Sequence, residues 1–194
     1  MVEDISRLMD HLNIPKAHIA GYSLGGFIVL KFLCLHPDRV QSAAICAAGW
    51  KNPDDPSPIP DPYGPPGNQP AAEPAQPAAE ARTGMPSVLD RIRSAVGESI
   101  IRESAKHALK QGFRDLGVSR ADLESNQVPA VCFIGSQDGL WALGDDLHKH
   151  MANLEFVEIP GASHFTTPFY GQFRYGLRDF FMNHPMNLPK KASS

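Results

Sequence analysis

The sequence feature that most constrains the fold is the segment Gly21-Tyr22-Ser23-Leu24-Gly25-Gly26, which lies between two apolar runs. The run before it, 17–20, is typical of a buried strand, and the run after it, 27–33, is typical of a helix. We therefore expect a sharp strand-to-helix turn with Ser23 at its apex and its hydroxyl exposed. Glycines two residues before and after the serine are expected because larger side chains would clash as the helix folds back. The alternative is an ordinary turn in which the serine has no chemical role.

Helical and strand patterns alternate on both sides of this turn. Helices are expected at 2–12, 24–35, 141–151 and about 169–181, and strands at 17–22, 40–47, 129–135 and 155–159. Strands made of continuous apolar residues are typical of a parallel sheet that helices cover on both faces. The sequence therefore predicts the α/β class, with right-handed crossovers between mostly parallel strands.

The composition changes abruptly after the second predicted strand. Ten of the 18 prolines fall within 51–80, among small and polar residues, so we expect a mobile, extended insertion there. Helical spacing returns at 87–111, and Ser119-Arg120-Ala121-Asp122 resembles a capping box that begins a further short helix. We predict core segments at 1–50 and 126–185, a Pro-rich linker and helical lid at 51–125, and a flexible tail at 186–194.

Composition and charge exclude several classes of function. The 194 residues suffice for one domain, and the net charge of −3 comes from mixed acids and bases rather than a basic surface for nucleic acid. The sequence shows neither a membrane-spanning run nor a signal peptide. The three cysteines are far apart in apolar surroundings, which indicates buried thiols rather than a disulfide or metal site. We expect a cytoplasmic protein.

Two further polar residues follow predicted strands at the points where those strands end. Asp138 lies in the turn 135–139 after strand 129–135, and His164 lies in the loop 160–165 after strand 155–159. Each residue alone is more typical of a turn or of packing. Because the carboxyl ends of parallel strands meet at one edge of a sheet, we expect both side chains near Ser23. A serine hydroxyl needs such a base, and the base needs a group that orients it, before it can act as a nucleophile.

In this order, the G-x-S-x-G turn, the G-x-x-D turn and the G-x-x-H loop resemble the α/β-hydrolase fold family. The segment 36–40, His-Pro-Asp-Arg-Val, is also a common family sequence. The resemblance implies that Ser23 is a nucleophile, His164 its base and Asp138 the orienting acid. It implies an oxyanion hole that includes the backbone N–H of Leu24. The implied reaction is acyl transfer on a small ester or related acyl substrate, with no metal or organic cofactor.

We call the turn at residues 21–26 the elbow. Besides Ser23 and Leu24 it contains Gly21, Tyr22, Gly25 and Gly26, which the resemblance places around the nucleophile and its pocket. Tyr22 either lines the pocket or has a structural role. His18, in the strand before the elbow, is interpreted as a packed histidine.

Other candidate residues are set aside. Asp145 and Asp146 lie beyond the position of the acid turn, and they are interpreted as residues that cap or begin a helix turn. His148 and His150 are two residues apart, so on a helix they point to different sides and make a poor metal pair.

The family's sheet normally begins with several strands before the helix that leads to the elbow, and this chain begins at that helix. We therefore expect an N-terminally truncated member, whose second oxyanion donor cannot be assigned. Strand 17–22 would then be an open edge, at which the chain could self-associate. The alternative function is a non-catalytic remnant that acts only through binding at this edge. The triad itself does not choose among esterases, lactonases, thioesterases, carbon–carbon hydrolases, acyltransferases and haloperoxidases.

Overall fold

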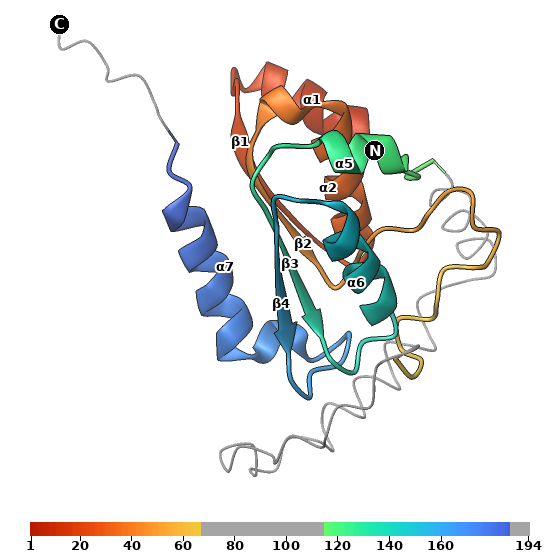
Figure 1. Ribbon diagram of the computed structural model, residues 1–194. Coiled ribbons are helices and arrows are strands. Elements are labelled where there is room, and N and C mark those ends of the chain that lie inside the picture. The colour runs from red at the N-terminus through yellow and green to blue at the C-terminus, as the bar shows by residue number, and fades with distance from the viewer. Residues whose placement is uncertain (67–114, 187–194) are drawn as a thin grey trace, which may run out of the picture.

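The structure, a computed structural model, describes residues 1–66 and 115–186 (Figure 1). Its described residues form one parallel sheet in the order β1-β2-β3-β4. The strands are β1 (Ala17–Tyr22), β2 (Val40–Cys46), β3 (Ala130–Gly135) and β4 (Leu154–Ile159). All four carboxyl ends therefore lie at one edge of the sheet.

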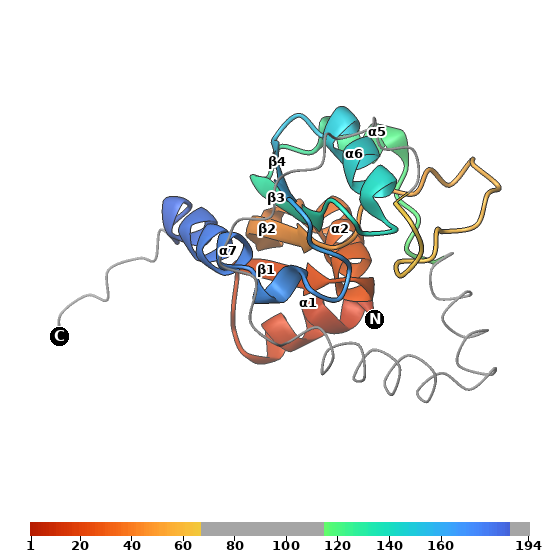
Figure 2. The same ribbon diagram turned by 90° about the horizontal axis from the view of Figure 1, so that it is seen from below.

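Helices cover both faces of this sheet, as Figures 1 and 2 show. One face carries α1 (Val2–His11), α2 (Leu24–Leu35), α5 (Arg120–Ser125) and α6 (Trp141–His150), and the other carries α7 (Gly171–Asn183). Short 3₁₀ turns, η1 (Pro37–Arg39) and η2 (Thr167–Phe169), precede β2 and α7. The predicted α/β fold, a mostly parallel sheet between helices, is confirmed.

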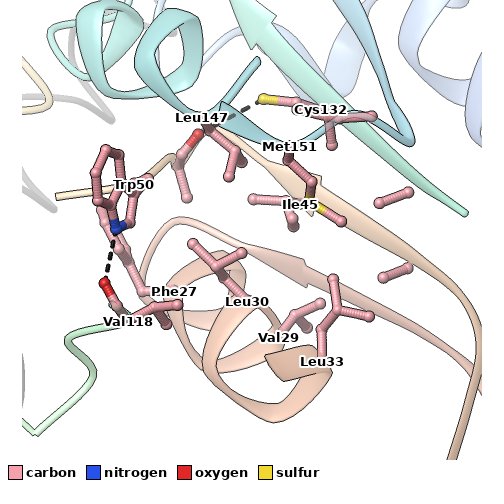
Figure 3. Packing of buried hydrophobic residues seen from close by; sticks show 14 of the residues in the cluster. Phe27, Val29, Leu30, Leu33, Ile45, Trp50, Val118, Cys132, Leu147 and Met151 are labelled. Atoms are coloured by element: carbon pink, nitrogen blue, oxygen red, sulfur yellow. Dashed lines mark hydrogen bonds between the residues drawn. The ribbon is translucent and has the colours of Figure 1, made fainter. Parts of the chain in front are cut away.

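The larger core lies between the sheet and the helices α2 and α6 (Figure 3). Ile45 of β2 is fully buried there, between Leu30 of α2 and Leu147 of α6. The continuous apolar character of β2 and β3 follows from this position, because a central parallel strand has no face in contact with water.

Trp50 joins distant parts of the chain at the margin of this core. Its backbone N–H donates to the carbonyl of Leu143 over 2.9 Å. Its indole Nε1–H donates to the carbonyl of Val118 over 2.8 Å (Figure 3). The side chain is 4 % exposed, so a missing partner would leave a buried polar group unsatisfied. Trp50 therefore fixes the points at which the chain leaves the core and returns to it.

Most predicted elements agree with the structure to within one or two residues. Ser119 is the expected N-cap, since its Oγ accepts a hydrogen bond of 3.1 Å from the N–H of Asp122 at the start of α5. The Asp122 carboxylate accepts from the hydroxyl of Ser119 over 2.7 Å. The last helix begins later than expected. Phe169 belongs to η2 and is 61 % exposed, because the extended backbone of Tyr170 separates it from α7. The helix start expected at about 169 is therefore two residues too early.

The expected helix at 87–111 lies outside the described residues, as do most of the expected lid and the tail from 187 onward. The described part of the Pro-rich stretch, 51–66, contains neither helix nor strand. In the two described ranges, no helix has the length and apolar character needed to cross a membrane.

Candidate active site

The turn of the elbow consists of a single residue between a strand and a helix. β1 ends at Tyr22 and α2 begins at Leu24, so Ser23 alone makes the turn. Its backbone has φ 54° and ψ −121°, which is a strained conformation for a residue with a side chain. The N–H of Ser23 donates to the carbonyl of Cys46 over 2.9 Å, so the end of β2 helps to hold the turn.

The glycines of the elbow differ in how tightly they are packed. A Cβ on Gly21 would lie 2.0 Å from the carbonyl oxygen of Gly25, and a Cβ on Gly26 would lie 2.5 Å from Cβ of Ala48. A Cβ on Gly25 would meet no atom within 4 Å. The expected clash is therefore confirmed for Gly21 and wrong for Gly25. The close approach at the helix start involves Gly26 instead, where α2 packs on the chain that follows β2.

The structure brings Ser23, His164 and Asp138 into one hydrogen-bonded series. His164 Nε2 lies 2.9 Å from Ser23 Oγ, and His164 Nδ1 lies 2.8 Å from Asp138 Oδ2. Asp138 is fully buried, and its other oxygen accepts a hydrogen bond of 2.9 Å from the N–H of Leu140. Both carboxylate oxygens thus act as acceptors, which fixes the N–H of the imidazole on Nδ1 and leaves Nε2 free to accept a proton.

The loop that carries His164 is held by its own hydrogen bonds and by Tyr22. The N–H of Ser163 donates to Thr166 Oγ1 over 2.8 Å, and the carbonyl of Ser163 accepts from Thr167 Oγ1 over 2.9 Å. The hydroxyl of Tyr22 donates to the carbonyl of His164. Burial raises the pKa of Tyr22 well above its usual range, so the hydroxyl stays a neutral donor. Tyr22 therefore has the structural role that its position in the sequence left open.

A hollow of about 280 Å³ opens beside the nucleophile. It is lined by Tyr22, Ser23, Tyr63, His164, Phe165, Pro168 and Phe169. Tyr22 thus has both of the roles considered for it. A larger hollow of about 530 Å³ lies at the opposite end of the sheet, beside the start of β2, and contains none of the three hydrogen-bonded residues. The smaller hollow is the candidate site because Ser23 and His164 are among its lining residues.

Tyr63 is a site residue that sequence reasoning missed. Its ring lies 5.4 Å from the ring of His164 in an edge-to-face arrangement. A signal was available, since Tyr63 is the only aromatic residue between 51 and 80. An aromatic side chain in a segment with almost no other large apolar residue indicates a specific contact.

Leu24 is the first residue of α2, so its backbone N–H has no acceptor within the helix. Because Leu24 directly follows Ser23, this N–H is next to the serine along the chain. The described residues allow no assignment of a second donor.

The histidines set aside from the site have other contacts. His18 Nδ1 lies 2.8 Å from Ser42 Oγ, which confirms the interpretation of a packed histidine. The ring of His148 stacks on Phe156 at 5.3 Å, whereas the ring of His150 packs 4.8 Å from Trp50. These two rings therefore face different parts of the molecule.

Comparison with known proteins places the fold in a family. Residues 1–99, just over half of the chain, match the profile of the family described as alpha/beta hydrolase fold. The chain belongs to the α/β-hydrolase fold family.

Curated relatives match over short segments of the chain. The chain is 44 % identical to homoserine O-acetyltransferase of Thermus thermophilus over 43 residues, which is 22 % of this chain and 11 % of that protein. It is 46 % identical over 46 residues to the dihydrolipoyllysine-residue acetyltransferase component of the acetoin cleaving system of Pseudomonas putida, 24 % of this chain and 12 % of that protein. The chain thus spans about a tenth of the length of these relatives.

Solved structures resemble the chain over most of its length. The meta-cleavage product hydrolase CumD of Pseudomonas fluorescens IP01 superposes with a TM-score of 0.66 at 18 % identity, covering 95 % of this chain and 71 % of that one. The enol-lactonase of Burkholderia xenovorans LB400 gives a TM-score of 0.56 at 25 % identity, with coverage of 92 % and 70 %. At such identities, the first of these likenesses concerns the fold alone.

Proposed function

We propose that the chain is a serine hydrolase that cleaves a small carboxylic ester or a related acyl substrate by way of an acyl-enzyme. The observation that carries this proposal is the unbroken series of hydrogen bonds from Asp138 through His164 to Ser23 Oγ, which ends in a hollow. A histidine that only packs would not need a buried carboxylate on one nitrogen and a strained serine on the other.

In the first half of the reaction, Ser23 Oγ attacks the carbonyl carbon and its proton passes to His164 Nε2. Asp138 holds the Nδ1–H of the imidazole and stabilises the positive charge that forms. When the tetrahedral intermediate collapses, the bond to the alcohol oxygen breaks and His164 gives its proton to that oxygen. An acyl-enzyme remains on Ser23.

In the second half, water attacks the acyl carbon while His164 Nε2 takes a proton from it. The bond to Ser23 Oγ breaks, the oxygen recovers its proton from His164, and the carboxylic acid leaves. In both halves the negative oxygen accepts a hydrogen bond from the N–H of Leu24. A single donor of this kind is worth about 10²–10³ in rate.

The names of the structural neighbours support hydrolysis as the reaction class. They include a meta-cleavage product hydrolase, an enol-lactonase and an esterase. Two curated relatives are named as acetyltransferases, and their names fit the same acyl-enzyme with an acceptor other than water.

Labelling with a fluorophosphonate probe tests the proposal, because such probes react with activated serines. The wild type and the control Ser125→Ala, which alters an exposed serine of α5, are expected to be labelled, and Ser23→Ala is not. Circular dichroism shows whether each protein is folded. Equal labelling of the folded Ser23→Ala variant, or no labelling of the folded wild type, would refute the proposed function.

A second candidate function is self-association through β1, and the contrast between the two sheet edges favours it. The edge strand β4 carries Glu155 and Glu158, and charged side chains discourage an edge from pairing with another chain. The edge strand β1 contains no acidic or basic residue other than His18, and its Ala20 is exposed.

Sedimentation velocity over a range of concentrations tests this candidate. Self-association is expected in the wild type and is expected to disappear in Ala20→Lys, which adds a charge to the edge. Ala152→Lys, at an exposed alanine before β4, is the matched control. A wild type that remains monomeric at every concentration contradicts edge pairing.

A further inference from the structure

The hollow beside Ser23 has an uncharged and largely aromatic lining. In the described part of the chain its walls contain no Lys, Arg, Asp or Glu side chain. Resting on the proposed function, we propose that the site selects substrates whose acyl group is uncharged and about the size of an aryl ring. We further propose that Tyr63 determines this specificity by contacting that group.

Tyr63 is held in place by the turn that carries the acid. The N–H of Gly139, the residue after Asp138, donates to the carbonyl of Pro62 over 3.1 Å. Within the loop, the N–H of Tyr63 donates to Asp61 Oδ1 over 2.9 Å. Because the first bond joins the loop to the turn and the second orders the loop itself, the ring of Tyr63 keeps a defined position relative to the site.

The ring of Tyr63 forms one wall of the hollow while remaining open to a ligand. Its edge-to-face contact with His164 uses one part of the ring, and the residue is still 59 % exposed. Phe169, which is 61 % exposed, lines the same hollow. Exposed aromatic rings on the walls of one hollow are suited to bind a second aromatic group by stacked or edge-to-face contact.

The absence of cations from the described lining argues against charged acyl groups. A carboxylate on the substrate would lose part of its hydration on entering and would find no Lys or Arg side chain among the lining residues. The volume of about 280 Å³ equals that of about nine waters at roughly 30 Å³ each. That space suits a phenyl ring with the attached ester carbonyl.

The first experiment compares two p-nitrophenyl esters of the same chain length. The butyrate ends in a methyl group, and the mono-succinate carries a carboxylate in its place. We expect kcat/KM for the butyrate to exceed that for the succinate by about tenfold or more. Equal values for the two esters, with hydrolysis that depends on Ser23, would overturn the inference while leaving the proposed function intact.

The second experiment uses p-nitrophenyl benzoate and acetate with variants of Tyr63. Tyr63→Ala is expected to raise KM for the benzoate more than KM for the acetate, so that the ratio of the two KM values rises by about tenfold. Tyr63→Phe keeps the ring and should behave as the wild type. Tyr175→Ala is the matched control, because Tyr175 is 60 % exposed on α7 and does not line the hollow.

The outcomes of this experiment separate the two proposals. An equal loss on both esters in Tyr63→Ala, or no loss on either, overturns the specificity role. No Ser23-dependent hydrolysis of any ester refutes the proposed function, and the inference falls with it.

Discussion

The two glycines that flank Ser23 should respond in opposite ways to the same substitution. In the sequence pattern they are equivalent, but in the structure only Gly21 is crowded. A methyl group on Gly21 would lie 2.0 Å from the carbonyl oxygen of Gly25, where ordinary contacts lie at 3.4–4 Å. A methyl group on Gly25 would enter open space at the start of α2.

The expected magnitudes follow from these distances. Gly21→Ala forces backbone against backbone, which costs about 3 kcal/mol and lowers Tm by roughly 6–12 °C in a chain of this size. Gly25→Ala replaces a glycine by the best helix former. Because the position lies in the first turn, the gain is about 0.5 kcal/mol, and Tm rises by roughly 1–2 °C.

Thermal unfolding followed by circular dichroism gives the Tm of each variant and of the wild type under the same conditions. Fluorophosphonate labelling of Gly25→Ala then reports whether the elbow keeps its geometry. The reasoning is refuted if Gly21→Ala is as stable as the wild type, or if Gly25→Ala loses as much stability as Gly21→Ala.

Three further predictions concern buried and titratable groups. Asp138→Asn should lower kcat for ester hydrolysis by about 10⁴, because the amide favours the wrong imidazole tautomer, whereas the control Asp145→Asn should leave kcat unchanged. A loss below tenfold in Asp138→Asn would contradict the role of the carboxylate. Burial raises the pKa of the Cys46 thiol to about 12, so at pH 8 this thiol should not react with a thiol reagent within minutes until guanidinium unfolds the chain. Rapid reaction of all three cysteines in the folded chain would contradict this. Desolvation and the nearby His184 lower the pKa of His18 below 6.5, so the unfolded chain binds the proton more readily and stability falls as the pH drops below 6.5. Urea midpoints at pH 7 and pH 5 should therefore differ less in His18→Gln than in the wild type, and an equal difference would contradict the assignment.

The positions of Ser23, Asp138 and His164 could be predicted because each lies in the turn or loop that follows a strand of the parallel sheet. The carboxyl ends of parallel strands share one edge of the sheet, so residues that follow different strands in the sequence lie close together in the fold. The packing of the glycines could not be predicted in the same way. Whether a Cβ fits at Gly25 depends on where α2 lies relative to the end of β2, and the local pattern carries no information about that distance.

Phe169 and Tyr63 show two further limits of reading a pattern. Helical spacing alone predicts a last helix from about 169, but the extended backbone at Tyr170 separates Phe169 from α7, and Phe169 is exposed. Tyr63 lies in a segment whose composition argues against packing. Its position depends on one hydrogen bond between Pro62 and Gly139, residues that are far apart in the sequence.

The two hydrogen bonds of Trp50 have a consequence for how such a chain can diversify. They hold together the points where the chain departs after β2 and rejoins before α5, so the frame that positions the three polar residues is closed without the stretch between them. The entropic cost of closing a longer connection grows only with the logarithm of its length, about 0.6 kcal/mol for each doubling. Segments of different length and sequence can therefore be exchanged between Trp50 and Val118 at little cost to the frame. The exchanged segment would then act as a module that changes the surroundings of the three polar residues, while the frame that positions them stays the same.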